Sequence, residues 1–281
     1  MIISTTITLT HMKIGIVLSG GGIRGIAHLG VLSALKKTGI KFDHIVGTSA
    51  GSIAGAFYAA GIDPEEAFNI FMRTRLIKFV RPAFGSLGLV NIEKTGDIFK
   101  EYLPAHIEDL KTPLTICTTN FSEGNVAYFS KGPLIRAIHA SCCIPGVFKP
   151  IMIHDQMHVD GGVLNNFPVE PLLNNSDYII GSTCNHLKPV DKIVGITRLM
   201  QRAGIMSINH DMERKSRFCN LMIEPKGMGE INTFDTRKAE TIYWIAHEEA
   251  LKTIRDSESF QQLLAAQRNP LIGFNNSNTA H

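Results

Sequence analysis

Two glycine-rich turns, each placed directly after a short apolar run, constrain the fold of this chain more than any other feature. The first turn covers residues 20–25, Gly-Gly-Gly-Ile-Arg-Gly, and the second covers residues 47–51, Gly-Thr-Ser-Ala-Gly. Short runs rich in β-branched residues that end in turn residues are typical of buried strands. We therefore expect strands over residues 13–19 and 42–46, each of which ends at one of the two turns.

A helix is predicted between these strands. Apolar residues recur at helical spacing over residues 23–37, and Gly39 stands where a helix would end. A strand, a helix and a second strand in this order form a right-handed crossover with parallel strands. Both glycine-rich turns are then expected at the same carboxyl edge of the sheet, where they can face one substrate.

The second turn fits the G-x-S-x-G pattern of a serine on a sharp strand-to-helix turn. Gly47 and Gly51 leave room for the strained backbone and for close approach of a substrate. Ser49 is therefore the candidate nucleophile. The amides of Gly21 and Gly22, at the start of a helix, are candidates for an oxyanion hole.

A serine nucleophile needs a base, and Asp160 is the best candidate. It follows an apolar segment and precedes Gly161 and Gly162, which leave space around its carboxylate. No histidine has a comparable local context. Since an unperturbed aspartate has a pKa near 3.9, this role requires an environment that shifts the pKa or a strong hydrogen bond to Ser49.

These motifs, in this order, resemble those of the bacterial patatin-like phospholipases, which use a Ser-Asp dyad without histidine. Two further segments, residues 140–150 and 163–169, are also similar to the family, and the resemblance spans roughly residues 13–255. It implies an α/β fold of three layers, with a central mixed, mainly parallel sheet flanked by helices.

The resemblance also implies a function. Ser49 would accept the acyl group of a phospholipid or lysophospholipid, and Asp160 would be the general base, without a metal or another cofactor. The oxyanion hole would be formed by the turn that contains Gly20, Gly21, Gly22, Ile23 and Arg24, with Arg24 bracing it. Supporting positions of the motifs are Gly25, Gly47, Gly51, Gly161 and Gly162.

Three alternatives remain open from the sequence. The first turn also fits the G-x-G-x-x-G pattern of dinucleotide binding, although the nearby acid, Asp43, stands at the beginning of the second strand rather than at its end. The order serine, aspartate, histidine would be available to a triad that uses His186, His210 or His247. A lipid-binding or regulatory protein with little catalysis is the third alternative.

Further elements are expected downstream. Strands are predicted over residues 114–118, 126–130, 178–182 and 221–224, and a hairpin turn over residues 155–156. Helices are predicted to begin at Pro64, over residues 193–208 and over residues 236–254, with Asp63 and Asp235 as caps of the first and last. The helix over residues 193–208 is either a core helix or a mobile cap over the site.

The 281 residues, of which 44% are hydrophobic, are enough for one large α/β domain. We expect this catalytic domain over residues 13–266, after a short extension over residues 1–12 and before a polar tail over residues 267–281. No metal-ligand cluster is expected, because the five cysteines show no CxxC spacing and the histidines are scattered.

The odd number of cysteines and the lack of a signal peptide predict a cytoplasmic protein. No apolar run reaches the length of a membrane-spanning helix, and a net charge of +3 is too small to indicate nucleic-acid binding. Residues 73–90 combine basic and apolar side chains without an acid. Peripheral contact with anionic lipid is one interpretation of that segment, and an ordinary packed excursion is the other.

Overall fold

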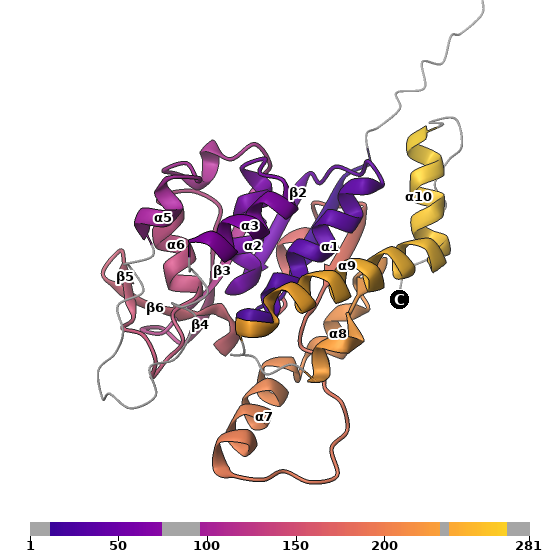
Figure 1. Ribbon diagram of the computed structural model, residues 1–281. Helices are drawn as coiled ribbons and strands as arrows, with labels where there is room; N and C mark the ends of the chain where they lie inside the picture. The colour runs from indigo at the N-terminus through magenta and orange to yellow at the C-terminus, as the bar shows by residue number, and fades with distance from the viewer. Residues whose placement is uncertain (1–11, 75–95, 231–235, 269–281) are drawn as a thin grey trace, which may run out of the picture.

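The computed structural model describes residues 12–74, 96–230 and 236–268 (Figure 1). Its centre is an eight-stranded sheet with the order β5-β6-β3-β2-β1-β7-β8, and β4 pairs with β3 outside this path. The strands β1, β2, β3, β7 and β8 pair in parallel, whereas β4, β5 and β6 pair antiparallel. The predicted fold class, a mixed and mainly parallel sheet flanked by helices, is confirmed. The strands are β1 (Ile14–Leu18), β2 (His44–Thr48), β3 (Leu114–Asn120), β4 (Asn125–Phe129), β5 (Ile151–Ile153), β6 (Gln156–Asp160), β7 (Tyr178–Ser182) and β8 (Leu221–Ile223).

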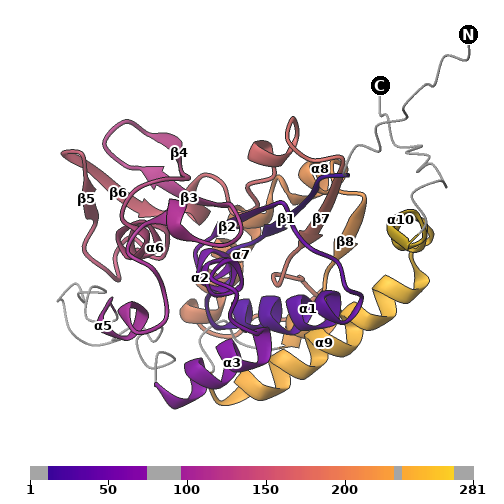
Figure 2. The same cartoon turned by 90° about the horizontal axis from the view of Figure 1, so that it is seen from above.

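The long helices α1, α3 and α9 lie together on one face of the sheet (Figure 2). The other face is covered by the chain that follows β6 and by the segment around α8, which together bury Phe167, Leu172 and Cys219 against the strands. The described helices of regular α form are α1 (Ile26–Lys37), α2 (Ala50–Ala59), α3 (Pro64–Arg73), α5 (Gly96–Lys100), α6 (Leu134–Ser141), α7 (Ile196–Asn209), α8 (Met212–Ser216), α9 (Ala239–Asp256) and α10 (Glu258–Arg268).

Strand β1 is buried on both faces, which explains why every residue in it other than Gly15 is apolar. Ile14, Ile16 and Leu18 belong to the main core cluster with α1 and α9, whereas Val17 packs into the second cluster on the opposite face. A central parallel strand is buried on both faces, so apolar residues run on without polar alternation. The core on both sides holds the carboxyl ends of β1 and β2 at one level, with Leu18 opposite Gly47 in the register.

The structure shifts some predicted boundaries. Strand β2 begins at His44 rather than at residue 42, because Asp43 bonds to both backbone groups of Ile14 at the entry of the sheet. It also continues to Thr48, since Thr48 still pairs with Cys117 of β3. The first turn of the predicted helix over residues 23–37 is a 3-10 turn over Gly22–Gly25, and α1 follows it.

Two other details of the prediction also change or find support. The hairpin turn between β5 and β6 lies at His154 and Asp155, both with positive φ angles (49° and 61°), rather than at residues 155–156. The cap of α3 is as predicted, because the Asp63 side chain accepts a hydrogen bond from the Glu65 amide and Pro64 is the first helical residue.

The helix α7 lies at the surface of the molecule rather than in its core. It lies apart from the sheet, at the bottom of the view in Figure 1, and Ile196 and Met200 are 70% and 63% exposed. The interpretation as a core helix is therefore wrong, while its mobility stays a prediction. The sequence pattern misleads here because it shows that a helix has an apolar stripe, but not what covers that stripe.

Some predictions fall outside the described residues. Residues 75–95, which include nearly all of the segment proposed for lipid contact, and Asp235, the proposed cap of the last predicted helix, are among them. The domain limits 13–266 likewise stay a prediction. Within the described ranges, no helix combines the length and the apolar character needed to cross a bilayer.

Candidate active site

Ser49 stands on the sharp turn between β2 and α2. Its backbone angles are φ 51° and ψ −123°, a conformation that residues with a side chain rarely adopt. A Cβ atom at Gly51 would lie 2.3 Å from the Leu18 carbonyl oxygen, and one at Gly47 would lie 2.6 Å from the Gly51 carbonyl oxygen. The turn therefore requires glycine on both sides of the serine because backbone atoms approach too closely for a side chain.

The Ser49 hydroxyl donates a hydrogen bond of 2.7 Å to Oδ2 of Asp160. Asp160 is the last residue of β6, which pairs with β3, and β3 in turn lies beside β2. The second carboxylate oxygen, Oδ1, accepts a hydrogen bond of 2.8 Å from the Gly162 amide. One oxygen thus fixes the orientation of the carboxylate while the other faces the serine.

Both members of this pair are buried, since Ser49 is 8% and Asp160 is 7% exposed. Burial raises the pKa of Asp160 to about 6, while the hydrogen bonds from Ser49 and Gly162 act in the opposite direction. A carboxylate with this pKa is ionised at neutral pH and is still a much better proton acceptor than an exposed aspartate.

The glycine-rich turn lies directly beside the serine. A Cβ atom at Gly20 would come within 3.3 Å of Ser49 Cβ, and one at Gly25 would lie 2.2 Å from Ala50 Cβ. The Gly20 amide donates to the Asn166 carbonyl oxygen (3.1 Å) and so has a partner already. In the described part of the chain, the amides of Gly21 and Gly22 donate to no other group.

The amides of Gly21 and Gly22 therefore remain available, at the start of the 3-10 turn, to donate hydrogen bonds to a substrate oxygen. Ile23 and Arg24, the other predicted members of the turn, are 2% and 5% exposed. Burial lowers the pKa of Arg24, and the nearby Cys184 acts in the opposite direction. Positive charge and unbonded amides in one turn favour a developing oxyanion.

Sequence reasoning assigned no role to Ser141 or Asn166, although both lie in the segments that resemble the family. Ser141 accepts a hydrogen bond of 2.8 Å from the Ser49 amide and donates one of 2.6 Å to the Cys117 carbonyl oxygen. Asn166 holds Gly20 from the other side through backbone and side-chain bonds. Their position inside these segments was the only signal in the sequence.

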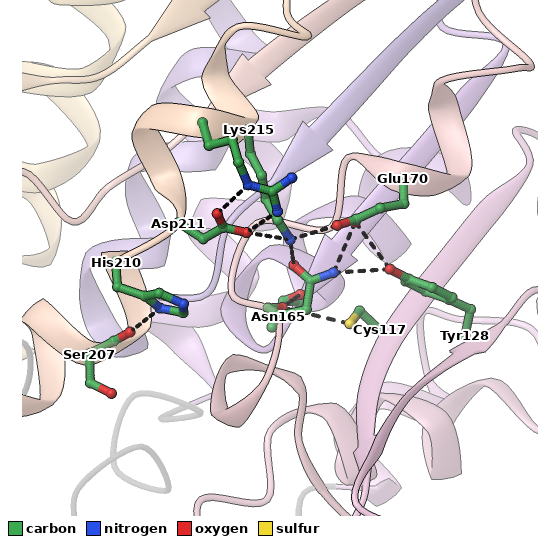
Figure 3. A network of polar contacts seen from close by, with 10 residues as sticks. Cys117, Tyr128, Asn165, Glu170, Ser207, His210, Asp211 and Lys215 are labelled. Atoms are coloured by element: carbon green, nitrogen blue, oxygen red, sulfur yellow. Dashed lines mark hydrogen bonds and ion pairs between the residues drawn. The ribbon is translucent and has the colours of Figure 1, made fainter.

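A polar network joins α8 to the segment that follows Asp160 (Figure 3). Lys215 of α8 contacts Asn165 Oδ1 at 2.6 Å and Glu170 Oε1 at 2.7 Å, and its side chain is 8% exposed. Asn165 donates to Glu170 and to the Tyr128 hydroxyl, both at 2.9 Å. Its carbonyl oxygen accepts from the Thr48 hydroxyl at 3.0 Å. The network thus links the residue before Ser49 to the segment that follows Asp160.

A small pocket opens beside this segment. It is lined on one side by Gly162, Val163 and Leu164, which follow Asp160, and on the other side by the end of α7 and the start of α8. Ser207 and Ile208 are among the lining residues from α7. The pocket therefore places the end of α7 beside the segment that follows Asp160.

The three histidines considered for a triad have other partners. His186 lies 3.4 Å from Glu224, and His210 bonds to the Ser207 carbonyl oxygen at 2.8 Å. His247 is buried between α9 and α1, where it bonds to the Gly30 carbonyl oxygen and to Lys37. Within the described ranges, none of the hydrogen bonds of these histidines reaches Ser49 or Asp160.

The structure also bears on the remaining interpretations of the sequence. Asp43 is held at the entry of β1 through Ile14, at the opposite end of the strands from the glycine-rich turn, where it cannot bind a ribose. His28 is a buried packing residue, as expected, with bonds to the Ser182 hydroxyl and the Ser19 carbonyl oxygen. Over residues 12–74, 96–230 and 236–268, no three His, Cys, Asp or Glu side chains are grouped as a metal site would require.

Known proteins share both the sequence and the architecture of this chain. A family model described as patatin-like phospholipase matches residues 16–173. An uncharacterised NTE family protein of Mycobacterium bovis is 34% identical over 178 residues, which are 62% of this chain and 49% of that protein. Lysophospholipase NTE1 of Mycosarcoma maydis is 36% identical over 172 residues, which are 59% of this chain and 9% of that protein.

The crystal structure of VipD from Legionella pneumophila has a similar fold, with a TM-score of 0.51 and 13% identity over 88% of this chain and 67% of that chain. At this identity the likeness concerns the fold alone. The chain spans about half the length of the mycobacterial relatives and about a tenth of the fungal ones.

Proposed function

The chain belongs to the patatin-like phospholipase family, and on this premise we propose that it is a serine acyl hydrolase that cleaves fatty-acyl esters of membrane lipids. The observation that carries the proposal is the hydrogen bond of 2.7 Å from the Ser49 hydroxyl to Asp160. A nucleophile within hydrogen-bonding distance of a buried base, next to unbonded amides, is the arrangement that acyl transfer requires.

The first half of the reaction forms an acyl-enzyme. The Ser49 oxygen attacks the ester carbonyl carbon while Asp160 Oδ2 takes the hydroxyl proton. Negative charge then develops on the former carbonyl oxygen, and the amides of Gly21 and Gly22 stabilise it. Asp160 returns the proton to the leaving alkoxide, which departs as a lysolipid or an alcohol, and the acyl group remains on Ser49.

The second half releases the fatty acid. A water molecule takes the place of the departed alcohol, and Asp160 accepts one of its protons as the oxygen attacks the acyl-serine. The same amides hold the second oxyanion, and the proton moves from Asp160 to the Ser49 oxygen as the ester breaks. Every proton in this cycle passes through the one carboxylate, whose other oxygen stays bonded to the Gly162 amide.

A phospholipid or lysophospholipid is the proposed substrate class. Support comes from the family and from the name lysophospholipase that the fungal relatives carry. Lipids of both kinds carry the fatty-acyl ester that the dyad would attack. The exposed Val163 and Leu164, which line the pocket beside Asp160, offer apolar surface for an acyl chain.

The experiment that tests this function measures fatty-acid release from mixed phospholipid and lysophospholipid vesicles. We expect the intact chain to release fatty acid without added nucleotide, and we expect Ser49→Ala to reduce release to background while its melting temperature stays close to that of the parent. Ser52→Ala is the control, because the hydroxyl of this neighbouring buried serine donates to the Ser49 carbonyl oxygen rather than to Asp160. Equal release by the parent and by Ser49→Ala would refute the role of Ser49, and no release from either would favour a lipid-binding protein with little catalysis.

A further inference from the structure

The helix α7 turns an apolar stripe to solvent. The stripe consists of five residues at the spacing of one helical side, and we call it the α7 surface: Ile196, Leu199, Met200, Ala203 and Met206. All five are exposed, whereas Ile205 and Ile208 on the opposite side are half-buried. A helix of a globular domain normally directs its apolar stripe to the core, so this orientation needs a partner.

The chain just before α7 enlarges the same apolar region. Val190, Ile193 and Val194 are 50%, 37% and 62% exposed. Among the described residues, seven of the seventeen large hydrophobic side chains that are exposed fall within residues 190–206. Single exposed hydrophobic residues are ordinary, but such a concentration marks an interaction site.

The charge of this segment indicates the kind of partner. Residues 190–210 contain three basic residues, Lys192, Arg198 and Arg202, and one acidic residue, Asp191. Lys192 and Arg198 are exposed. An exposed helix that combines an apolar stripe with basic residues fits the boundary between anionic headgroups and acyl chains. A protein partner with an acidic groove would meet the same charges but has no other support in the structure.

The end of α7 is also connected to the loops that carry the dyad. The last turn of α7 lines the pocket together with Val163 and Leu164, which are 46% and 44% exposed. In addition, Asn209 at the end of α7 donates to the Asn185 carbonyl oxygen at 2.9 Å. Asn185 in turn donates to the Gly20 carbonyl oxygen of the glycine-rich turn. The helix that would bind lipid is therefore tied at its end to the glycine-rich turn and to the segment that follows Asp160.

We propose that α7 is an interfacial helix that docks this protein on an anionic lipid surface, with the α7 surface in the headgroup region. The proposal rests on the proposed function for the choice of lipid as the partner. The helix lies after residue 173, where the match to the family ends, so the docking device is assigned from this chain's own residues.

The test measures binding separately from hydrolysis. All variants carry Ser49→Ala, so that vesicles stay intact, and their sedimentation with vesicles is compared for phosphatidylcholine alone and for phosphatidylcholine with an equal part of phosphatidylglycerol. Met200→Glu places a charge on the α7 surface, and Arg198→Gln removes one cation. Met152→Glu is the matched control, because Met152 is also exposed (45%) but lies on strand β5.

We expect binding to the anionic vesicles, weak binding to phosphatidylcholine alone, and about tenfold weaker binding for Met200→Glu, as the loss of one buried apolar side chain predicts. Arg198→Gln should weaken binding by a smaller factor and reduce its dependence on salt, and Met152→Glu should bind like the parent. Equal binding by Met200→Glu and Met152→Glu would overturn the proposal. So would a dimer in lipid-free solution that Met200→Glu separates, because the partner would then be a second copy.

The two proposals fail in different ways. Binding through α7 without ester hydrolysis by the protein that retains Ser49 would contradict the proposed function and leave the docking helix intact. Hydrolysis of a dispersed, water-soluble ester that depends on Ser49, together with no binding to either kind of vesicle, would contradict the docking helix alone.

Discussion

At the scale of single residues, the environment of Asp160 determines both the chemistry and its dependence on pH. The carboxylate must be ionised to accept the Ser49 proton, and burial raises its pKa to about 6. We therefore expect kcat/KM for a soluble ester to rise with pH through a limb near pH 6 and to stay high at neutral pH. A rate profile measured from pH 4 to pH 8 checks this, and a limb near pH 4 would show that burial does not act on this carboxylate.

The same raised pKa affects stability. In the unfolded chain the carboxyl of Asp160 has a pKa near 3.9, so between about pH 4 and pH 6 the folded state holds a proton that the unfolded state has released. The contribution of Asp160 to the free energy of unfolding thus falls as the pH rises through this window, and it stays lost above pH 6. Asp160→Asn, which cannot ionise, should therefore be more stable than the parent at pH 7.5, by about 2–3 kcal/mol, and similar to it at pH 4.

Urea denaturation of both proteins at the two pH values measures this difference. Asp155→Asn is the control, since Asp155 lies in the turn between β5 and β6 and has no contact with the dyad. A gain in stability that is the same at pH 4 and at pH 7.5 would contradict the explanation by proton linkage, because it would then come from a change in packing or hydrogen bonding.

Residues of the site differ in how far the sequence reveals them. Ser49 and Asp160 could be named because Ser49 lies between Gly47 and Gly51 and Asp160 is followed by two glycines, and the family resemblance that those motifs indicate is confirmed. Ser141 and Lys215 carry no such local mark. Their contacts with Ser49 and Asn165 join positions that are 92 and 50 residues apart in the chain, so only the folded structure reveals them.

At the scale of helices and strands, close packing of α1 against α9 fixes the layer that covers the sheet. A Cβ atom at Gly30 of α1 would lie 2.3 Å from the Tyr243 carbonyl oxygen, and this neighbour is backbone that cannot rotate away. Gly30→Ala should therefore force the helices apart and lower the free energy of unfolding by about 1–3 kcal/mol.

Gly204→Ala is the matched substitution, because Gly204 lies in α7 and a Cβ atom there meets nothing within 4 Å. It should stabilise its helix by up to about 1 kcal/mol through the better helix propensity of alanine. The midpoints of urea unfolding compare the two variants. Equal midpoints would show that α1 and α9 can separate without cost.

Elements were predictable where local pattern and burial agree. β7 was predicted with the bounds that the structure shows, because an apolar run that is buried on both faces has clear ends. The start of β2 was missed because it is set by the contact of Asp43, the residue before β2, with Ile14 of β1, and the two are distant in the sequence. The environment of α7 was left open between a core helix and a cap, because the stripe of a surface helix and the stripe of a core helix are the same pattern.

At the scale of the whole molecule, the chain beyond the family match holds the catalytic loops that precede it. The family match ends at residue 173, whereas Lys215 of α8 reaches back to Asn165 and Glu170, and Asn165 in turn holds Thr48. The proposed dyad therefore depends on a part of the chain that carries none of its motifs. This is a physical reason why residues beyond the motif region belong to the same folding unit.

Lys215→Met tests this dependence. It keeps the length of the buried side chain but removes the charge, so Glu170 and Asn165 lose their shared partner. Glu170 is partly exposed, and water compensates for some of the loss, so we expect the free energy of unfolding to fall by about 1–3 kcal/mol. Turnover should fall several-fold as well, because the backbone around Thr48 and the Asp160 loop loses its common support.

The control is Arg217→Met, which breaks the exposed ion pair with Glu213 and should leave the free energy of unfolding and the turnover nearly unchanged. If urea unfolding and ester turnover did not distinguish the two variants, the network in Figure 3 would contribute to neither stability nor catalysis. The motif region would then keep its geometry without contacts from α8.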